Sequence, residues 1–182
     1  MFDTLRTLLE FYPDHVSENS TDPDVKEVAR LLKMRPLSPF ARSIHVRMVD
    51  AGSPNDVELE EGLMVSPRVD AERFGIHFVA SPRHADVLIV SGPVTRNARM
   101  GVLKSYEAMA EPRAVVAAGD GACRGWPLHE IKSHYAIADS GCVKDVIPVD
   151  VSVLGSPPNP YQLLAGILKA GMILDQKSRQ KK

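Results

Sequence analysis

Cysteine is nearly absent from this chain: Cys123 and Cys142 are the only two among 182 residues. An iron–sulfur cluster is normally held by four thiolates, so two cysteines are too few for a cluster with ordinary ligands. The first residues also lack the charged start, apolar core and small-residue cleavage site of a signal peptide. We therefore expect a reduced, cytosolic pair of thiols rather than a disulfide.

Long apolar runs and an excess of one charge are missing as well. No run approaches the roughly 18 to 20 residues that a transmembrane helix needs. The 22 basic and 23 acidic residues give a net charge of −1 at pH 7, so the sequence shows no electrostatic footprint for nucleic acid. What is present, 44% hydrophobic and 25% charged residues, is typical of one soluble globular domain.

Strand patterns alternate with helical patterns between residues 41 and 175. The run Ala85–Val90 is almost wholly apolar, as expected for a strand that is covered on both faces. The alternation predicts an α/β domain with a mainly parallel sheet. The predicted strands are Ser43–Val49, Ile76–Val79, Ala85–Val90, Arg113–Ala118 and Asp145–Val149, and the predicted helices are Val57–Met64, Arg99–Met109 and Tyr161–Leu174.

Two flanking segments differ from this central domain. Residues 1–40 are predicted to form a helical extension with two short amphipathic helices, Phe2–Phe11 and Asp24–Leu32. Because such short helices are marginal alone, we expect them to pack on a partner, on a membrane surface or on their own domain. Residues 176–182 form a basic tail that is expected to fray.

Four loops follow the predicted strands, at residues 50–57, 91–99, 119–126 and 154–160. The carboxyl ends of parallel strands lie at one edge of a sheet, where the binding sites of such domains are found. The sequence therefore predicts that these four loops converge on one site.

Motifs in and around these loops resemble a known family. The most specific segment is ERFGIHFVASPRHADVLIVSGPVTRN, from Glu72 to Asn97, and further matches are Val49–Ser53, Ala118–Asp120, Ile147–Asp150 and Gly155–Pro158. Over residues 40–174 the chain resembles the small, 20 kDa protein of respiratory complex I and its counterpart in the group 4 membrane-bound NiFe hydrogenases. The branch of formate hydrogenlyase and hydrogenase-4-type complexes is the nearer one, since complex I proteins usually have adjacent cysteines in the first loop. The resemblance implies a flavodoxin-like, three-layer fold with one 4Fe–4S cluster at the contact with a large subunit.

The resemblance also places the four cluster ligands, and all four are replaced here. The branch has a pattern like G-S-C-N-x-C-E-L-E where this chain reads GSPNDVELE, from Gly52 to Glu60. The third ligand follows Gly-Asp, and the fourth lies in G-C-P-P. The corresponding residues, called the replaced positions below, are Pro54, Val57, Gly121 and Ser156.

The residues at the replaced positions are poor ligands. Cluster iron needs a soft, anionic donor, whereas proline and valine side chains have no donor, glycine has no side chain, and Ser156 could ligate only weakly as an alkoxide. Two weak substitutes lie nearby: Asp56, a hard oxygen donor, and Cys123, two residues past the third position. We therefore expect no cofactor, no metal and no catalytic residue in this chain, with a 4Fe–4S cluster as the alternative.

Taken together, these features predict a structural subunit of a complex I-related, group 4 hydrogenase-like membrane complex. The subunit would dock a large subunit, and its N-terminal extension would contact membrane-arm subunits at the cytoplasmic face of the inner membrane. The first alternative is a working electron-transfer subunit, with an unusual cluster on Cys123 and oxygen ligands. The second is a free-standing flavodoxin-like domain with a small-molecule site where the cluster would lie.

Overall fold

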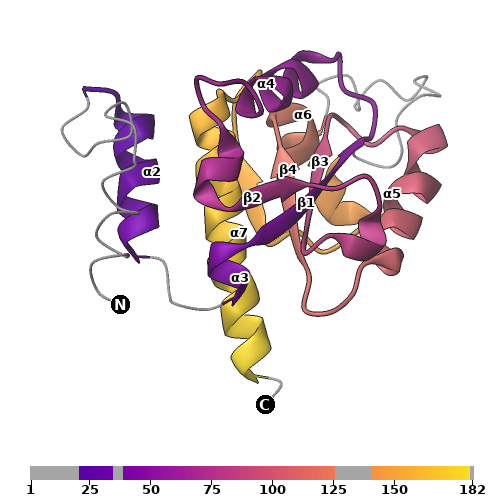
Figure 1. Cartoon of the computed structure of the whole chain (residues 1–182). Coiled ribbons are helices and arrows are strands. Elements are labelled where there is room, and N and C mark those ends of the chain that lie inside the picture. Colours follow the sequence, from indigo (N-terminus) through magenta and orange to yellow (C-terminus); the bar gives the residue numbers. More distant parts are fainter. Residues whose placement is uncertain (1–20, 35–38, 126–140, 181–182) are drawn as a thin grey trace.

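A single parallel sheet forms the centre of the molecule (Figure 1). The computed structural model describes residues 21–34, 39–125 and 141–180. Its five strands lie in the order β2-β1-β3-β4-β5, which is the flavodoxin-like order, so the predicted α/β fold is confirmed. The strands are β1 (Ile44–Asp50), β2 (Ile76–Phe78), β3 (Val87–Ser91), β4 (Ala114–Ala118) and β5 (Val151–Val153).

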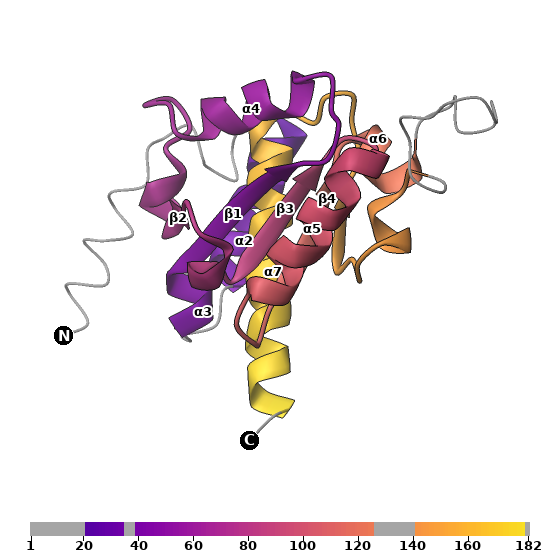
Figure 2. The ribbon, with the colours of Figure 1, turned by 90° about the vertical axis from the view of Figure 1, so that its right-hand side faces the viewer.

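Helices cover both faces of this sheet (Figures 1 and 2). One face carries α7 (Pro160–Gln180), which packs on β4 and β5, and the opposite face carries α5 (Arg96–Ala108). Every residue of β3 and β4 is buried, which explains why both strands are apolar throughout. The remaining elements are α2 (Pro23–Met34), α3 (Pro39–Arg42), α4 (Asp56–Met64), α6 (Asp120–Arg124) and the short 3-10 helices η2 (Ala71–Phe74), η3 (Pro82–His84) and η5 (Val143–Asp145).

The last strand lies later than the sequence predicted. The prediction was Asp145–Val149, whereas β5 begins at Val151 and residues 143–145 form η5. Pro148 explains the difference, because proline has no N–H to donate to a sheet ladder. The backbone N–H of Asp150 instead makes the first bond to β4, at the Val115 carbonyl oxygen 3.0 Å away.

Helix α2 packs on its own domain. Val25, Val28, Ala29 and Leu31 are buried, and they belong to the same core cluster as the apolar residues of α7. The apolar side of α2 therefore packs within the chain. Of the three surfaces that the sequence left open for this helix, namely a partner, a membrane and its own domain, the structure shows the last. The first predicted helix, Phe2–Phe11, lies outside the described residues.

Helix α7 is longer than predicted and includes most of the basic tail. It continues to Gln180 instead of ending at Leu174, so residues 176–180 are helical where the sequence predicted a frayed tail, and residues 181–182 lie outside the described residues. The ammonium of Lys177 donates to the carbonyl oxygen of Arg113, 2.9 Å away, and to Oδ1 of Asp150, 2.7 Å away. These two contacts, which join residues far apart in the sequence, hold the last turns of the helix against β4 and β5.

Candidate functional site

The four loops that follow the strands meet at one small pocket, as the sequence predicted. Its volume is about 40 Å³, room for a few water molecules at most. All four replaced positions line this pocket, and so does Asp56, whereas Cys123 does not. The lining residues are Pro54, Asp56, Val57, Gly92, Pro93, Ala118, Gly119, Asp120, Gly121, Gly155 and Ser156.

The first loop is held by Asp50 at the end of β1. Its Oδ1 accepts hydrogen bonds from the backbone N–H groups of Gly52, 2.7 Å away, and Ser53, 2.8 Å away. Gly52 has a φ of 129°, and a Cβ there would lie 2.9 Å from the carbonyl oxygen of Pro93, so glycine is required at this close approach. The turn leads into α4 and brings Val57 to the pocket, where its side chain is 3% exposed.

The third loop lies directly against the second. A Cβ on Gly121 would lie 2.9 Å from Cδ of Pro93 and 3.2 Å from its nitrogen. A Cβ on Gly119 would lie 2.9 Å from Cγ2 of Val57. A side chain at residue 121, including that of a cysteine, therefore fits only if one of these loops moves.

The fourth loop is joined by hydrogen bonds to the start of α6, a short helix within residues 119–126, where the sequence predicted a loop. The backbone N–H of Asp120 donates to the Gly155 carbonyl oxygen, 2.8 Å away, and Oδ1 of Asp120 accepts from the Gly155 N–H, 3.3 Å away. Ser156 itself is exposed at the pocket rim. Asp120 thus has a structural role in joining the two loops.

Cys123 is turned away from the pocket. Its Sγ donates to the carbonyl oxygens of Ala117, 3.3 Å away, and Val153, 3.6 Å away. Burial raises the pKa of the thiol, which favours the neutral form over the thiolate that a cluster needs. Cys123 is therefore no better placed as a ligand than the residues at the replaced positions.

The donors around the pocket do not fit a 4Fe–4S cluster. No thiolate lines the pocket, and its volume is small for four iron and four sulfide atoms. Within the described ranges, no group of three or more His, Cys, Asp or Glu side chains could hold a metal ion. That Pro54, Val57, Gly121 and Ser156 are former ligand positions remains a prediction from the resemblance.

Sequence reasoning missed an acidic cluster beside the pocket, in which Asp50 is exposed, Glu58 is half-buried and Glu61 is buried. The carboxylate of Glu58 accepts hydrogen bonds from the hydroxyls of Ser53 and Ser91. One turn further along α4, Glu61 is 2% exposed, and its Oε1 has no hydrogen-bond partner in the described part of the chain. Burial, and then the nearby carboxylates of Glu58 and Asp50, raise the pKa of Glu61 to about 8. The i, i+4, i+7 spacing of Val57, Glu61 and Met64 was the sequence signal that these three residues share the buried side of α4.

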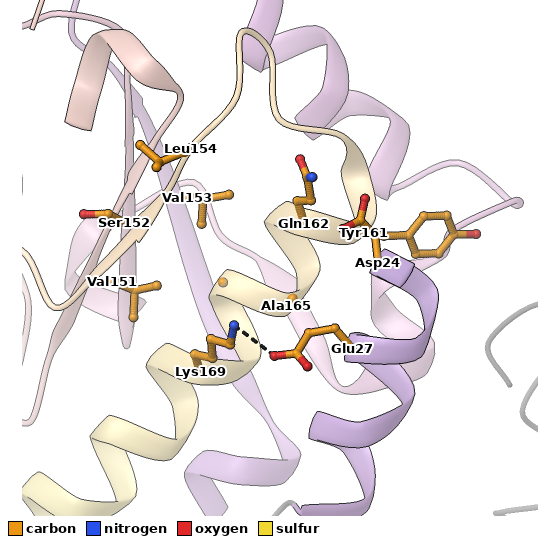
Figure 3. Close-up of a pocket in the computed structure, with 11 residues that line it drawn as sticks. Asp24, Glu27, Val151, Ser152, Val153, Leu154, Tyr161, Gln162, Ala165 and Lys169 are labelled. Atoms are coloured by element: carbon orange, nitrogen blue, oxygen red, sulfur yellow. Dashed lines mark ion pairs between the residues drawn. The ribbon is translucent and has the colours of Figure 1, made fainter. Parts of the chain in front are cut away.

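A second pocket of about 220 Å³ lies between β5, α7 and α2 (Figure 3). Lys169 on α7 pairs with Glu27 on α2, with Nζ 3.0 Å from Oε1. The side-chain amide of Asn159 donates to Oδ2 of Asp24, 2.6 Å away. These two contacts fasten α2 beside the pocket, and none of the replaced positions lines it.

The fold and site together define an α/β domain with flavodoxin-like strand order and a pocket at the carboxyl edge of its sheet. The chain belongs to the family described as NADH ubiquinone oxidoreductase, 20 Kd subunit, which matches residues 53–170. The resemblance stated from the loop motifs is thus confirmed.

Two curated relatives point to the hydrogenase branch. Formate hydrogenlyase subunit 7 of Escherichia coli is 36% identical over 84% of this chain and 58% of its own length. A probable membrane-bound hydrogenase subunit of Pyrococcus furiosus is 39% identical over 80% of this chain and 81% of its own length. The chain therefore spans little more than half of the first relative and most of the second.

Solved structures agree on the fold. A chain of the membrane-bound sulfane sulfur reductase, an archaeal respiratory membrane complex, has a TM-score of 0.61 and 24% identity over 85% of this chain and 77% of its own. A chain of an NAD⁺-reducing [NiFe]-hydrogenase has a TM-score of 0.51 and 15% identity over 65% of this chain and 85% of its own. In the described part of this chain, no helix has the length and apolar character needed to cross a membrane.

Proposed function

We propose that this chain is a structural subunit of a complex I-related, group 4 hydrogenase-like membrane complex, and that it holds no 4Fe–4S cluster. It docks a hydrogenase-type large subunit through the carboxyl edge of its sheet. Its N-terminal extension contacts membrane-arm subunits at the cytoplasmic face of the inner membrane. The single observation that carries the proposal is the pocket, where all four replaced positions meet without one thiolate.

The closeness of the loops supports this proposal. Val57 and Pro93 reach the Cβ positions of Gly119 and Gly121, so the space at this edge is filled by protein atoms. A pocket of about 40 Å³ also argues against a site for an organic small molecule, because ligand pockets usually measure roughly 300 to 1,000 Å³. An edge that is filled by protein atoms, with no space for an organic ligand, fits a docking role.

Helix α4 supports docking on the same edge. Leu59, Leu63 and Val65, within or just after this helix, are 65%, 49% and 54% exposed. Leu59 and Leu63 lie one turn apart on the same side of α4, and neighbouring exposed apolar side chains favour contact with another protein. Because α4 directly follows the first loop, a partner that covers its outer side would also cover the pocket.

Iron and sulfide analysis of the purified full chain tests the cluster part of the proposal. We expect no stoichiometric iron or acid-labile sulfide and no visible absorbance band. A stoichiometric cluster would refute the structural role and establish the electron-transfer alternative. The variant Cys123→Ser then distinguishes the ligands, since it lowers the iron content only if Cys123 binds the cluster.

Co-purification with a hydrogenase-type large subunit from the same organism tests the docking part. We expect Leu63→Glu to reduce the yield of the complex at least tenfold, because it places a charge within the apolar contact. The matched control is Met100→Glu, where the side chain is similarly exposed at 51% but belongs to α5, which covers the face of the sheet opposite α7. Equal loss in both variants, or in neither, would contradict docking through α4.

A further inference from the structure

Glu61 occupies a position that an apolar residue would normally fill. The inward row of α4 consists of Val57, Glu61 and Met64, which are 3%, 2% and 0% exposed. This helix packs on α7, and its other two buried residues belong to the main core cluster. An ionised carboxylate in such a place is costly unless it is paired, and Oε1 of Glu61 has no partner among the described residues.

The charges that act on Glu61 oppose its ionisation. Glu58 on the same helix and Asp50 at the end of β1 are both carboxylates, and both raise the pKa of Glu61 in addition to the effect of burial. The hydroxyls of Ser53 and Ser91 donate to the carboxylate of Glu58, so these two nearby donors are engaged by Glu58 and not by Glu61.

Helix α7 supplies no compensating cation. Its basic side chains are engaged elsewhere: Lys169 with Glu27, Lys177 with Asp150, and Arg179 with Asp175. The remaining ionisable groups of α7 are Tyr161, which lines the second pocket, and Asp175. A charged Glu61 would therefore be unpaired for as long as α4 stays packed on α7.

The outer side of α4 makes its packing unusual. The helix buries a carboxyl group while Leu59 and Leu63 are exposed to solvent. Burial of the apolar side chains of Val57 and Met64 favours the packing of α4 on α7, whereas an ionised carboxyl group between them would oppose it.

We propose that Glu61 is a proton-binding site that couples the packing of α4 to pH. With the proton bound, α4 lies against α7 and the first loop closes the pocket. When the proton passes to water, the carboxylate gains hydration only if α4 moves away, so the helix and the adjoining residues Pro54 and Val57 separate from the other loops. This inference does not depend on the proposed function, because it concerns only the chain itself.

Two measurements on the full chain test this site. In protein labelled with ¹³C at the glutamate carboxyl carbons, we expect one resonance to titrate near pH 8 and to be missing from Glu61→Gln. Hydrogen exchange of the α4 amides, corrected for the intrinsic pH dependence, should be about tenfold faster at about pH 9 than at about pH 6. The same comparison should show no change in Glu61→Gln, whose side chain cannot ionise.

Two further variants complete the test. Glu60→Gln alters a partly exposed neighbour on the same helix and should behave like the unaltered protein. Glu61→Met keeps the side-chain length without a titrating group, and it should abolish the pH dependence even if the glutamine variant folds poorly. Titration of Glu61 in the ordinary range of glutamate would overturn the proposal, and so would exchange in α4 that does not respond to pH.

Discussion

The burial of Glu61 predicts a specific pH dependence of stability. Its pKa rises from 4.5 to about 8 on folding, mainly through burial. Between these values the folded chain holds a proton that the unfolded chain has lost. The free energy of unfolding therefore falls as the pH rises from about 4.5 to about 8, and this contribution then stays constant.

The size of the effect follows from the shift. About 3.5 pKa units at 1.36 kcal/mol each give an upper limit of about 5 kcal/mol, and water that reaches the carboxylate reduces it. Domains of this kind have total stabilities of about 5 to 15 kcal/mol, so the loss would be a large fraction of the whole.

Urea denaturation at a series of pH values measures this contribution. Other groups also titrate, so the informative quantity is the difference between the unaltered chain and Glu61→Gln. We expect that difference to grow with pH in favour of the variant, by several kcal/mol between about pH 5 and pH 8. Parallel stability curves for the two proteins would show that Glu61 does not retain its proton, and would refute the reasoning.

Two further substitutions, one of them with a matched control, test how the loops and α7 are held. Gly121→Ala should lower the free energy of unfolding by about 1 to 3 kcal/mol, because its Cβ would lie 2.9 Å from Pro93. Gly101→Ala in α5, where a Cβ meets nothing within 4 Å, should instead raise it by about 0.5 to 1 kcal/mol, and a loss in both variants would contradict the argument. Asp150→Ala should cost about 1 to 3 kcal/mol in urea denaturation, because the side chain accepts from the Val115 N–H and from Lys177, whereas an unchanged midpoint would show that neither contact matters.

Much of the fold was predictable because the sheet core has a strong local signal. The apolar runs that form β3 and β4 are buried along their whole length. Because strands alternate with helices along the chain, the sheet was expected to be parallel, and the carboxyl ends of parallel strands lie at one edge. The convergence of the four loops could thus be predicted without a structure. Two shorter features could not, namely β5, where Pro148 delays the strand, and α6, which is too short to show a helical period.

The site was predictable in its position but not in its electrostatics. The resemblance placed Pro54, Val57, Gly121 and Ser156 together, and they line one pocket. The sequence showed Glu61 only as one of several acidic residues near a helix start. Its burial depends on which side of α4 faces α7, and the exposed leucines of that helix obscure the pattern. Cys123, a weak substitute two residues past the third replaced position, does not line the pocket, and its thiol donates to backbone carbonyl groups instead.

Helix α7 has a practical consequence for experiments on docking. It starts at Pro160, just after the loop of Ser156, and its 21 residues give it a length of roughly 30 Å. Figure 1 shows that it ends at the side of the molecule opposite α4. A purification tag or surface linker fused after the last residue would therefore be attached far from the carboxyl edge. Immobilised in this way, the chain would present α4 and the pocket outward, so that binding of a large subunit could be measured without obstruction.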